Sequence, residues 1–220
     1  MSDPTFFGGN NNYHNDDDDK SKSTRQIDTA RRGLAFLPLV QEMQACFTAV
    51  ETCPVPVIAA LHGTCLGAGM DLACCADVRL ASCDCIFSVR EVRLGLAADV
   101  GTLQRFPKLC GHASRVRELC LTGEDFDAQE ALRIGFVSRL SERVWEDAIQ
   151  LATHVAALSP VAVVGTKTSL IYSRDHSVLD GLHHVATHNA LALMSSDLGL
   201  TSVRGGTRPT YENMAPHARL

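Results

Sequence analysis

The chain has 220 residues, of which 45% are hydrophobic and 20% are charged, an ordinary globular composition that suits one domain with a sizeable core. Its formal net charge of -5, without a block of Lys and Arg, argues against a general affinity for nucleic acid. Aromatic residues make up only 5% of the chain, too few to indicate a base-stacking platform.

Nine cysteines raise the question of disulfides or a zinc site, and their spacing argues against both. Cys74 and Cys75 are adjacent, Cys83 and Cys85 are separated by one residue, and no CxxC pair exists. The odd number also leaves at least one thiol free. We therefore expect reduced cysteines that act as small buried hydrophobic residues.

The N-terminal segment, residues 1–33, is rich in Gly, Asn, Asp and Ser, and it is predicted to be disordered because little of it could be buried. It has neither the basic nor the apolar region of a secretory signal. No apolar run reaches the length of about 18 residues that a membrane span needs, so we expect no membrane helix.

Apolar residues then recur at helical spacing, which predicts a helix over 34–50 that ends before Cys53-Pro54. The apolar run 57–61 is typical of a buried parallel strand. Later segments continue the alternation: a helix at 71–76, strands at 78–81 and 86–88, helices at 102–109, 113–121 and 128–134, and a strand at 136–138.

After Glu142 the pattern is helical nearly to Leu200, and a new helix is expected to begin at Ser159-Pro160. This order predicts an α/β body over residues 34–142, followed by a helical C-terminal region over 143–220.

The most informative segment is PVIAALHGTCLGAGMDL, residues 56–72, in which a predicted strand runs through a glycine-rich turn into a helix. The small residues Gly67, Ala68 and Gly69 would let a ligand approach the backbone. The free N–H groups at a helix start suit a developing oxyanion. An ordinary strand-to-helix turn explains the same residues equally well.

This segment resembles the signature of the crotonase (enoyl-CoA hydratase/isomerase) superfamily. The resemblance extends over about residues 34–200 and includes Ala76-Asp77-Val78-Arg79, Gly111, Ala131, Gly135, Val137 and Ser159-Pro160. It implies an α/β fold of the crotonase ββα-spiral type, with C-terminal helices that assemble a homotrimer or a dimer of trimers. It also implies an acyl-CoA substrate and no cofactor besides the coenzyme A that the substrate carries.

Three acids stand out within that frame: Asp71, Glu91 and Asp99. The stretch 89–105 resembles the dienoyl-CoA isomerase branch, whereas hydratases carry Glu at position 71 and a small residue at position 99. The resemblance implies that Glu91 is the base near the thioester, Asp99 the distal acid, and Asp71 the partner that tunes them. Ala68, flanked by Gly67 and Gly69, would supply a backbone oxyanion donor. From the residues alone, Asp99 could instead cap the helix 102–109.

The function implied is the isomerisation of 3,5-dienoyl-CoA to 2,4-dienoyl-CoA by acid/base proton transfer in fatty-acid β-oxidation. The family fold, however, begins with strands and a second oxyanion donor for which this sequence has no counterpart. We therefore expect an N-terminally truncated form of the fold. An enoyl-CoA hydratase and a catalytically impaired assembly subunit remain alternatives.

Other residues are assigned more ordinary roles. His183, His184 and His188 lie on one predicted helix, but no acid completes a metal site, so none is predicted. Lys167 is expected to face solvent, with the adenine-phosphate end of coenzyme A as the alternative. Asp77 and Arg105 are expected to be structural.

The last three residues, Ala218-Arg219-Leu220, match the small-basic-Leu form of the peroxisomal import signal. Together with reduced cysteines and a β-oxidation enzyme, this predicts a peroxisomal or peroxisome-like location.

Overall fold

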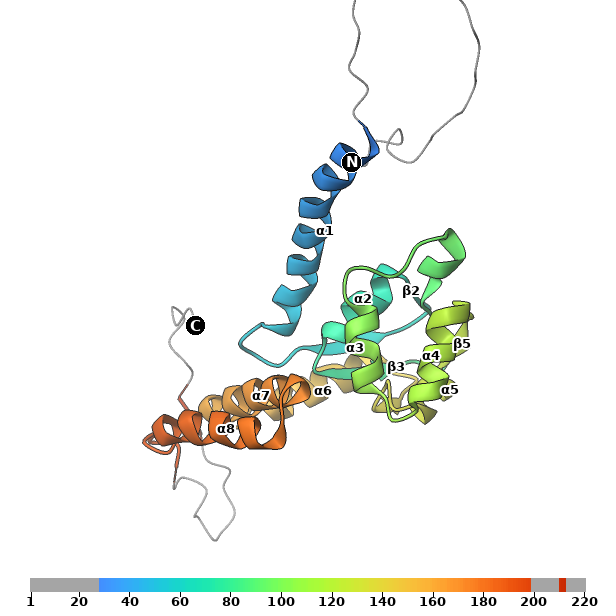
Figure 1. The fold of residues 1–220 in the computed structure, drawn as a ribbon. Coiled ribbons are helices and arrows are strands. Elements are labelled where there is room, and N and C mark those ends of the chain that lie inside the picture. Colours follow the sequence, from blue (N-terminus) through green and yellow to red (C-terminus); the bar gives the residue numbers. More distant parts are fainter. Residues whose placement is uncertain (1–27, 199–209, 213–220) are drawn as a thin grey trace, which may run out of the picture. The chain divides into compact units, whose positions relative to one another are not determined.

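The computed structural model describes residues 28–198 and 210–212 of the chain, and it divides into two compact units, residues 1–36 and 37–220. Most of the segment predicted to be disordered, and the C-terminal tripeptide, lie outside the described residues. Figure 1 traces the elements in chain order.

The first helix, α1 (Thr29–Glu51), begins earlier than the sequence pattern predicts, at Thr29 instead of residue 34. Its start is explained by Asp28, whose Oδ1 accepts a hydrogen bond of 2.9 Å from the N–H of Arg31. By length and composition α1 could cross a membrane, and α6 (Val144–Ala156) and α7 (Pro160–Asp175) meet that criterion only if joined across a 112° bend. Core helices and signal sequences also meet it, so the absence of a membrane helix stays a prediction.

Two small three-stranded sheets form the body. The first has the order β1 (Ile58–Leu61), β3 (Val78–Ala81), β6 (Arg139–Leu140), and all its pairs are parallel. The second has the order β2 (Thr64–Leu66), β4 (Ile86–Ser88), β5 (Phe126–Asp127). There β2 runs parallel to β4, and β5 is antiparallel to it.

The chain therefore contains the same structural unit twice: a strand of the first sheet, a turn, a strand of the second sheet, and then a helical segment. The first repeat is β1, β2 and α2 (Ala68–Cys75), and the second is β3, β4 and the 3₁₀-helix η2 (Arg90–Leu94). This is the predicted ββα spiral. The remaining helices are α3 (Thr102–Leu109), α4 (Ala113–Thr122), α5 (Ala128–Arg133), α6 (Val144–Ala156), α7 (Pro160–Asp175) and α8 (Val178–Ala192).

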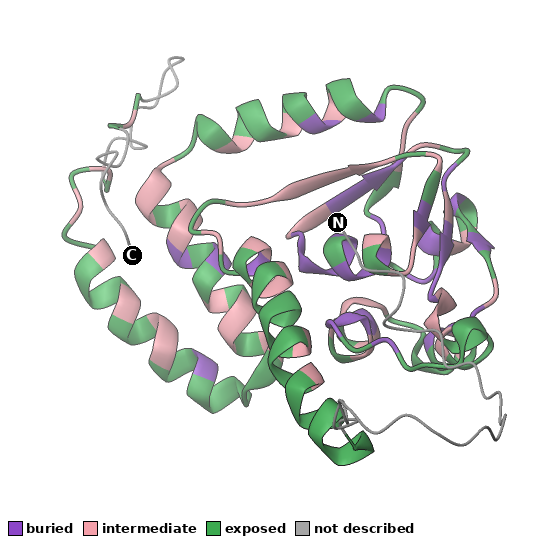
Figure 2. Ribbon diagram, turned by 90° about the horizontal axis from the view of Figure 1, so that it is seen from above, coloured by how far each residue is buried: buried purple, intermediate pink, exposed green. Residues whose placement is uncertain are grey.

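Four phenylalanines form the centre of the main core. Phe87 of β4 stacks on Phe126 of β5 at 5.4 Å between ring centroids and meets Phe136 edge-on at 5.7 Å. Phe106 of α3 meets Phe136 edge-on at 5.0 Å. Burying each ring contributes about 1.5–3 kcal/mol. Figure 2 shows the buried residues gathered on the strands and on the helices packed against them.

The predicted strand at 136–138 is wrong. Gly135 has φ 84°, and the N–H groups of Phe136 and Val137 both donate back to the carbonyl of Ala131. These residues are therefore a turn that inserts two apolar side chains into the core. The strand begins only at Arg139, where β6 joins β3.

The expectation that Lys167 faces solvent is wrong. Its side chain is 5% exposed, and its Nζ lies 2.7 Å from Oδ2 of Asp77 and 3.0 Å from the carbonyl of Val55. Asp77 also accepts from the N–H of Val57 at 2.7 Å. Asp77 is thus structural, as predicted, and so is Arg105, which pairs with Glu51 at 3.0 Å.

All nine cysteines are free thiols, and Cys65, Cys74, Cys75 and Cys85 are buried. Burial raises the pKa of the Cys65 thiol to about 12, so it stays protonated and behaves as a small apolar group. Cys46 and Cys83, by contrast, are exposed.

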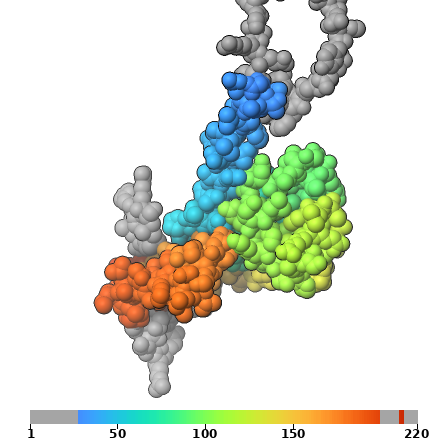
Figure 3. Space-filling model, in the orientation of Figure 1, coloured from blue at the N-terminus to red at the C-terminus, as the bar shows by residue number. Residues whose placement is uncertain are grey.

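The helices α7 and α8, orange in Figure 3, pack against each other and expose much apolar surface. Leu170 is 68% exposed and Leu191 79%. Within the described residues, the three histidines of α8 belong to no cluster of metal-ligating composition. His184 instead stacks on Tyr172 at 4.1 Å.

Candidate active site

The glycine-rich turn connects β2 to α2. Gly67 has φ 51° and ψ -118°, and its N–H donates to the carbonyl of Ser88 at 3.0 Å, which ties the turn to the end of β4. The helix begins at Ala68, earlier than the predicted start at 71. The N–H groups of Ala68 and Gly69 are therefore among the first of a helix, which have no partner within it.

Gly67 is required here for two reasons. Its positive φ is a conformation that side chains with a Cβ rarely adopt. A Cβ at this position would also lie 3.2 Å from Oε1 of Glu91. The carboxylate of Glu91 thus lies against the turn, and the absence of a side chain on Gly67 is what admits it.

Asp71, in the first turn of α2, is 1% exposed, and only one of its two carboxylate oxygens has hydrogen-bond partners. Its Oδ1 accepts two hydrogen bonds of 2.6 Å, from the N–H and from the hydroxyl of Thr102. Its Oδ2 is buried without a partner. An unpaired carboxylate oxygen in such a place is costly, which is typical of functional sites.

Glu91, on η2, is partly buried, and its Oε2 also lacks a partner. Burial raises the pKa of this carboxyl above its usual value, and electrostatic interaction with Asp71 and Asp99 raises it further. The other two predicted acids, Asp71 and Asp99, therefore both act electrostatically on Glu91.

Asp99 is exposed and lies in the loop before α3. The alternative that Asp99 caps this helix is wrong, because the N-cap residue is Gly101 and not Asp99. Asp71 holds the first N–H of α3 instead. Asp99 lines a cavity of about 340 Å³, and its carbonyl accepts from Nε2 of Gln44 at 2.6 Å.

Two residues in this arrangement were not predicted, Thr102 and Gln44. Thr102 stands at the first position of α3, where a polar side chain is common, so the sequence gives no sign that its partner is Asp71. Gln44 lies on α1, far from Asp99 in sequence. Both contacts depend on tertiary structure.

The chemistry available follows from these positions. A carboxylate with a raised pKa is a stronger base than an ordinary carboxylate, a second acid can give a proton, and backbone N–H groups can stabilise a developing oxyanion. Such a set suits proton transfer on a carbonyl compound.

Comparison with known proteins identifies the family of this chain. The sequence model of the enoyl-CoA hydratase/isomerase family matches residues 36–194. The chain belongs to this family. The predicted crotonase-type fold is confirmed as well, because the enoyl-CoA hydratase from Bacillus anthracis superposes with a TM-score of 0.75 at 28% identity, over 84% of this chain and 71% of that one.

Within the family the sequence is similar to dienoyl-CoA isomerases, as predicted. The mitochondrial Δ3,5-Δ2,4-dienoyl-CoA isomerase of Homo sapiens is 46% identical over 78% of this chain and 53% of its own length. The peroxisomal isomerase of Arabidopsis thaliana is 44% identical over 72% of this chain and 58% of its own. The chain thus spans about half the length of the curated relatives that it matches.

Proposed function

We propose that this chain is an isomerase that converts 3,5-dienoyl-CoA to 2,4-dienoyl-CoA by acid/base proton transfer in fatty-acid β-oxidation. One observation carries the proposal: Glu91, with a raised pKa, lies against the Gly67 turn and within the field of Asp71 and Asp99. The similarity to dienoyl-CoA isomerases supports it. No cofactor is needed besides the coenzyme A of the substrate.

In the proposed reaction, Glu91 removes a proton from C2, next to the thioester carbonyl. The electrons move along the chain, so that the double bonds at C3 and C5 become double bonds at C2 and C4. The N–H of Ala68 stabilises the enolate oxygen between the two steps. Asp99 delivers a proton to C6. Glu91 ends protonated and Asp99 ionised, and one proton returns from Glu91 to Asp99 before the next turnover.

Asp71 has a different role, because it is too deeply buried and too firmly bonded to Thr102 to act as a shuttle. Burial is the main reason that the pKa of Glu91 is raised, and the charge of Asp71 raises it further. A base whose pKa is nearer to the working pH is a better match for a weakly acidic C–H group.

The test is a spectrophotometric assay with a 3,5-dienoyl-CoA, in which a conjugated 2,4-dienoyl product absorbs differently from the substrate. A 2-enoyl-CoA hydration assay runs beside it. Isomerisation is expected. Hydration without isomerisation would assign the chain to the hydratases, and neither activity, with binding to family oligomers intact, would assign it to assembly.

We also propose a homotrimer or a dimer of trimers, built through the C-terminal helices. The exposed leucines of α7 and α8 support this, because a contiguous apolar surface is typical of an interface. Sedimentation at several concentrations is the test, and a well-folded monomer throughout would contradict the proposal.

A peroxisomal or peroxisome-like location is proposed from Ala218-Arg219-Leu220. The relatives named above include a peroxisomal and a mitochondrial form. A fluorescent fusion that leaves the C-terminus free should enter peroxisomes, and the same fusion without the last three residues should not.

A further inference from the structure

The carboxyl group of Asp71 is held in an asymmetric way that the reaction alone does not explain. Both donors that reach it, the N–H and the hydroxyl of Thr102, bind the same oxygen, at 2.6 Å each. The other oxygen is buried and unpaired. Thr102 itself is 0% exposed, so water does not compete for its hydroxyl.

The hydrogen bond from the backbone N–H of Thr102 to Asp71 would be enough to cap α3. The hydroxyl adds a second donor to an oxygen that already has one, while Oδ2 of the same carboxylate receives none. Two donors on one oxygen fix the rotation of the carboxylate and stabilise its negative charge. The arrangement thus serves the position and charge of Asp71 more than it serves the helix.

We propose that Thr102 is a positioning residue of this site, whose hydroxyl fixes the charged carboxylate of Asp71 beside Glu91. Thr102 touches no reacting atom. It acts through Asp71 on the proton affinity of Glu91, and only its effect on turnover rests on the proposed isomerase function.

The groups around Glu91 allow this influence to be isolated. Among the residues that the structure describes, Asp71 on α2, Asp99 before α3 and Cys120 on α4 are the titratable groups that interact with Glu91 from other elements. Burial raises the pKa of Cys120 to about 11, so this thiol stays neutral while Glu91 titrates. On η2 itself, Arg90 and Arg93 pair with Asp125.

Thr102→Val is the decisive variant, because valine has the same shape and keeps the N–H but lacks the hydroxyl. Thr102→Ser is its matched control, because serine keeps the hydroxyl. The readout is the side-chain carboxyl signal of Glu91, followed by ¹³C NMR against pH and assigned through its loss in Glu91→Gln. The titration midpoint of Glu91 should fall by about half a unit in Thr102→Val and stay at the wild-type value in Thr102→Ser.

A wild-type midpoint in folded Thr102→Val would overturn the proposal. If the valine variant does not fold, Asp71→Asn replaces it, since its amide oxygen can still accept from Thr102 while the charge is gone. The midpoint should then fall at least as far, and an unchanged midpoint would overturn the proposal equally.

Turnover separates this inference from the proposed function. In the 3,5-dienoyl-CoA assay, Thr102→Val should lower kcat about two- to threefold with KM unchanged, and Thr102→Ser should keep the wild-type kcat. If the wild type does not isomerise but the Glu91 midpoint shifts, the proposed function fails and the positioning role stands. If it isomerises and the midpoint does not shift, the reverse holds.

Discussion

The region around α2, η2 and α3 and the pair α7–α8 use the same kinds of side chain in opposite ways. Around α2, the core buries polar side chains: Asp71 is 1% exposed and Thr102 is 0% exposed. On α7 the only buried residues are Gly165 and Lys167, and on α8 only Gly181. Leucines lie on the surface there instead.

The difference shows which parts of the molecule are held in place by contacts within this chain. The acids are positioned by contacts within the body, such as Thr102 to Asp71 and Gln44 to Asp99. The helix α7 packs against α8 and is joined to the body by ion pairs, Lys167 with Asp77 and Arg174 with Glu51, while apolar side chains such as Leu170 remain exposed. The polar groups of the first region are thus held by contacts inside the body, whereas the second region leaves apolar side chains exposed, as the proposed trimer interface requires.

The largest expected effect belongs to Asp99→Asn, which tests the first half of that comparison. If Asp99 delivers the proton to C6, asparagine keeps the shape but cannot donate it, so kcat should fall by about two to four orders of magnitude. KM should change little. Steady-state kinetics with a 3,5-dienoyl-CoA measures both.

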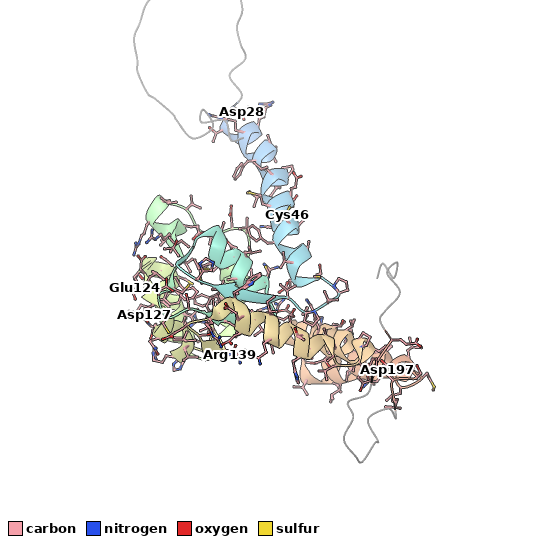
Figure 4. The ribbon with its side chains drawn as sticks, turned by 180° about the vertical axis from the view of Figure 1, so that it is seen from behind. Asp28, Cys46, Glu124, Asp127, Arg139 and Asp197 are labelled. Atoms are coloured by element: carbon pink, nitrogen blue, oxygen red, sulfur yellow. The ribbon has the colours of Figure 1, made fainter. Side chains whose placement is uncertain are left out.

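Asp127→Asn is the matched control, because Asp127, labelled in Figure 4, is a true N-cap whose side chain accepts from the N–H of Glu130. Asparagine caps equally well, so rate and stability should stay near wild type. Near-wild-type isomerisation in Asp99→Asn would exclude Asp99 as the donor and leave the family assignment intact.

The next largest effect is on stability and tests how α7 is attached. Lys167→Met removes a buried ammonium and leaves the carboxylate of Asp77 without its charged partner. The free energy of unfolding should drop by about 3 kcal/mol, at the low end for a buried pair because Asp77 is partly exposed. Chemical denaturation measures the change.

Lys108→Met makes the same substitution in an exposed pair, since Lys108 bonds Asp175 with 48% and 37% of the side chains exposed. Its cost should stay below about 1 kcal/mol. Equal costs for the two variants would show that the ion pair of Lys167 contributes no more than a surface contact.

A smaller effect is expected from Gly67→Ala, which places a methyl group against Glu91. The positive φ costs about 1–2 kcal/mol with any Cβ, and displacing Glu91 should lower kcat/KM about ten- to hundredfold. Gly69→Ala serves as the stability control, because its Cβ would lie 3.7 Å from Sγ of Cys65, an ordinary contact. Only the Gly67 variant should lose stability. Equal stability of both would contradict the strain argument.

The sequence predicted those elements whose limits are marked by local chemistry. The bounds of β3, β4 and α3 agree with the prediction, because a glycine or a polar run delimits each apolar segment. It missed β2, which lies within the segment interpreted as a glycine-rich turn, and β5, which has only two residues, too few to show a period. Both exist because β4 pairs with them, which is a tertiary fact.

The residues of the candidate site also fall into those that the sequence could indicate and those that it could not. Asp71, Glu91 and Asp99 could be selected because family resemblance marks residue types at fixed positions. Their partners could not, since Thr102 and Gln44 matter through a bond to one particular oxygen. Lys167 was misjudged for a related reason: its burial depends on Asp77, a residue 90 positions away.

The smallest predicted effect concerns the cost of keeping Glu91 in the site. Its pKa in the folded chain is raised by burial and by the nearby acids, so protonated Glu91 is favoured by folding. The stability that this contributes is fully present below the unfolded pKa and is lost as the pH rises through the folded pKa. Near pH 7 ionised Glu91 therefore destabilises the fold, and Glu91→Gln, which is neutral throughout, should raise Tm there. The gain should vanish as the pH falls below the folded pKa.

Glu130→Gln should behave in the opposite way, because ion pairs with Arg133 and Arg115 lower the pKa of Glu130 to about 2. Ionised Glu130 adds stability above its unfolded pKa, and that stability is lost as the pH falls through about 2. Glu130→Gln should thus lower Tm slightly at pH 7, since the ion pairs are partly exposed. Thermal melts of both variants at pH 7 and pH 4 make the comparison. If Glu91→Gln lowered Tm at pH 7 as Glu130→Gln does, Glu91 would be a structural carboxylate and not a base whose position in the site costs stability.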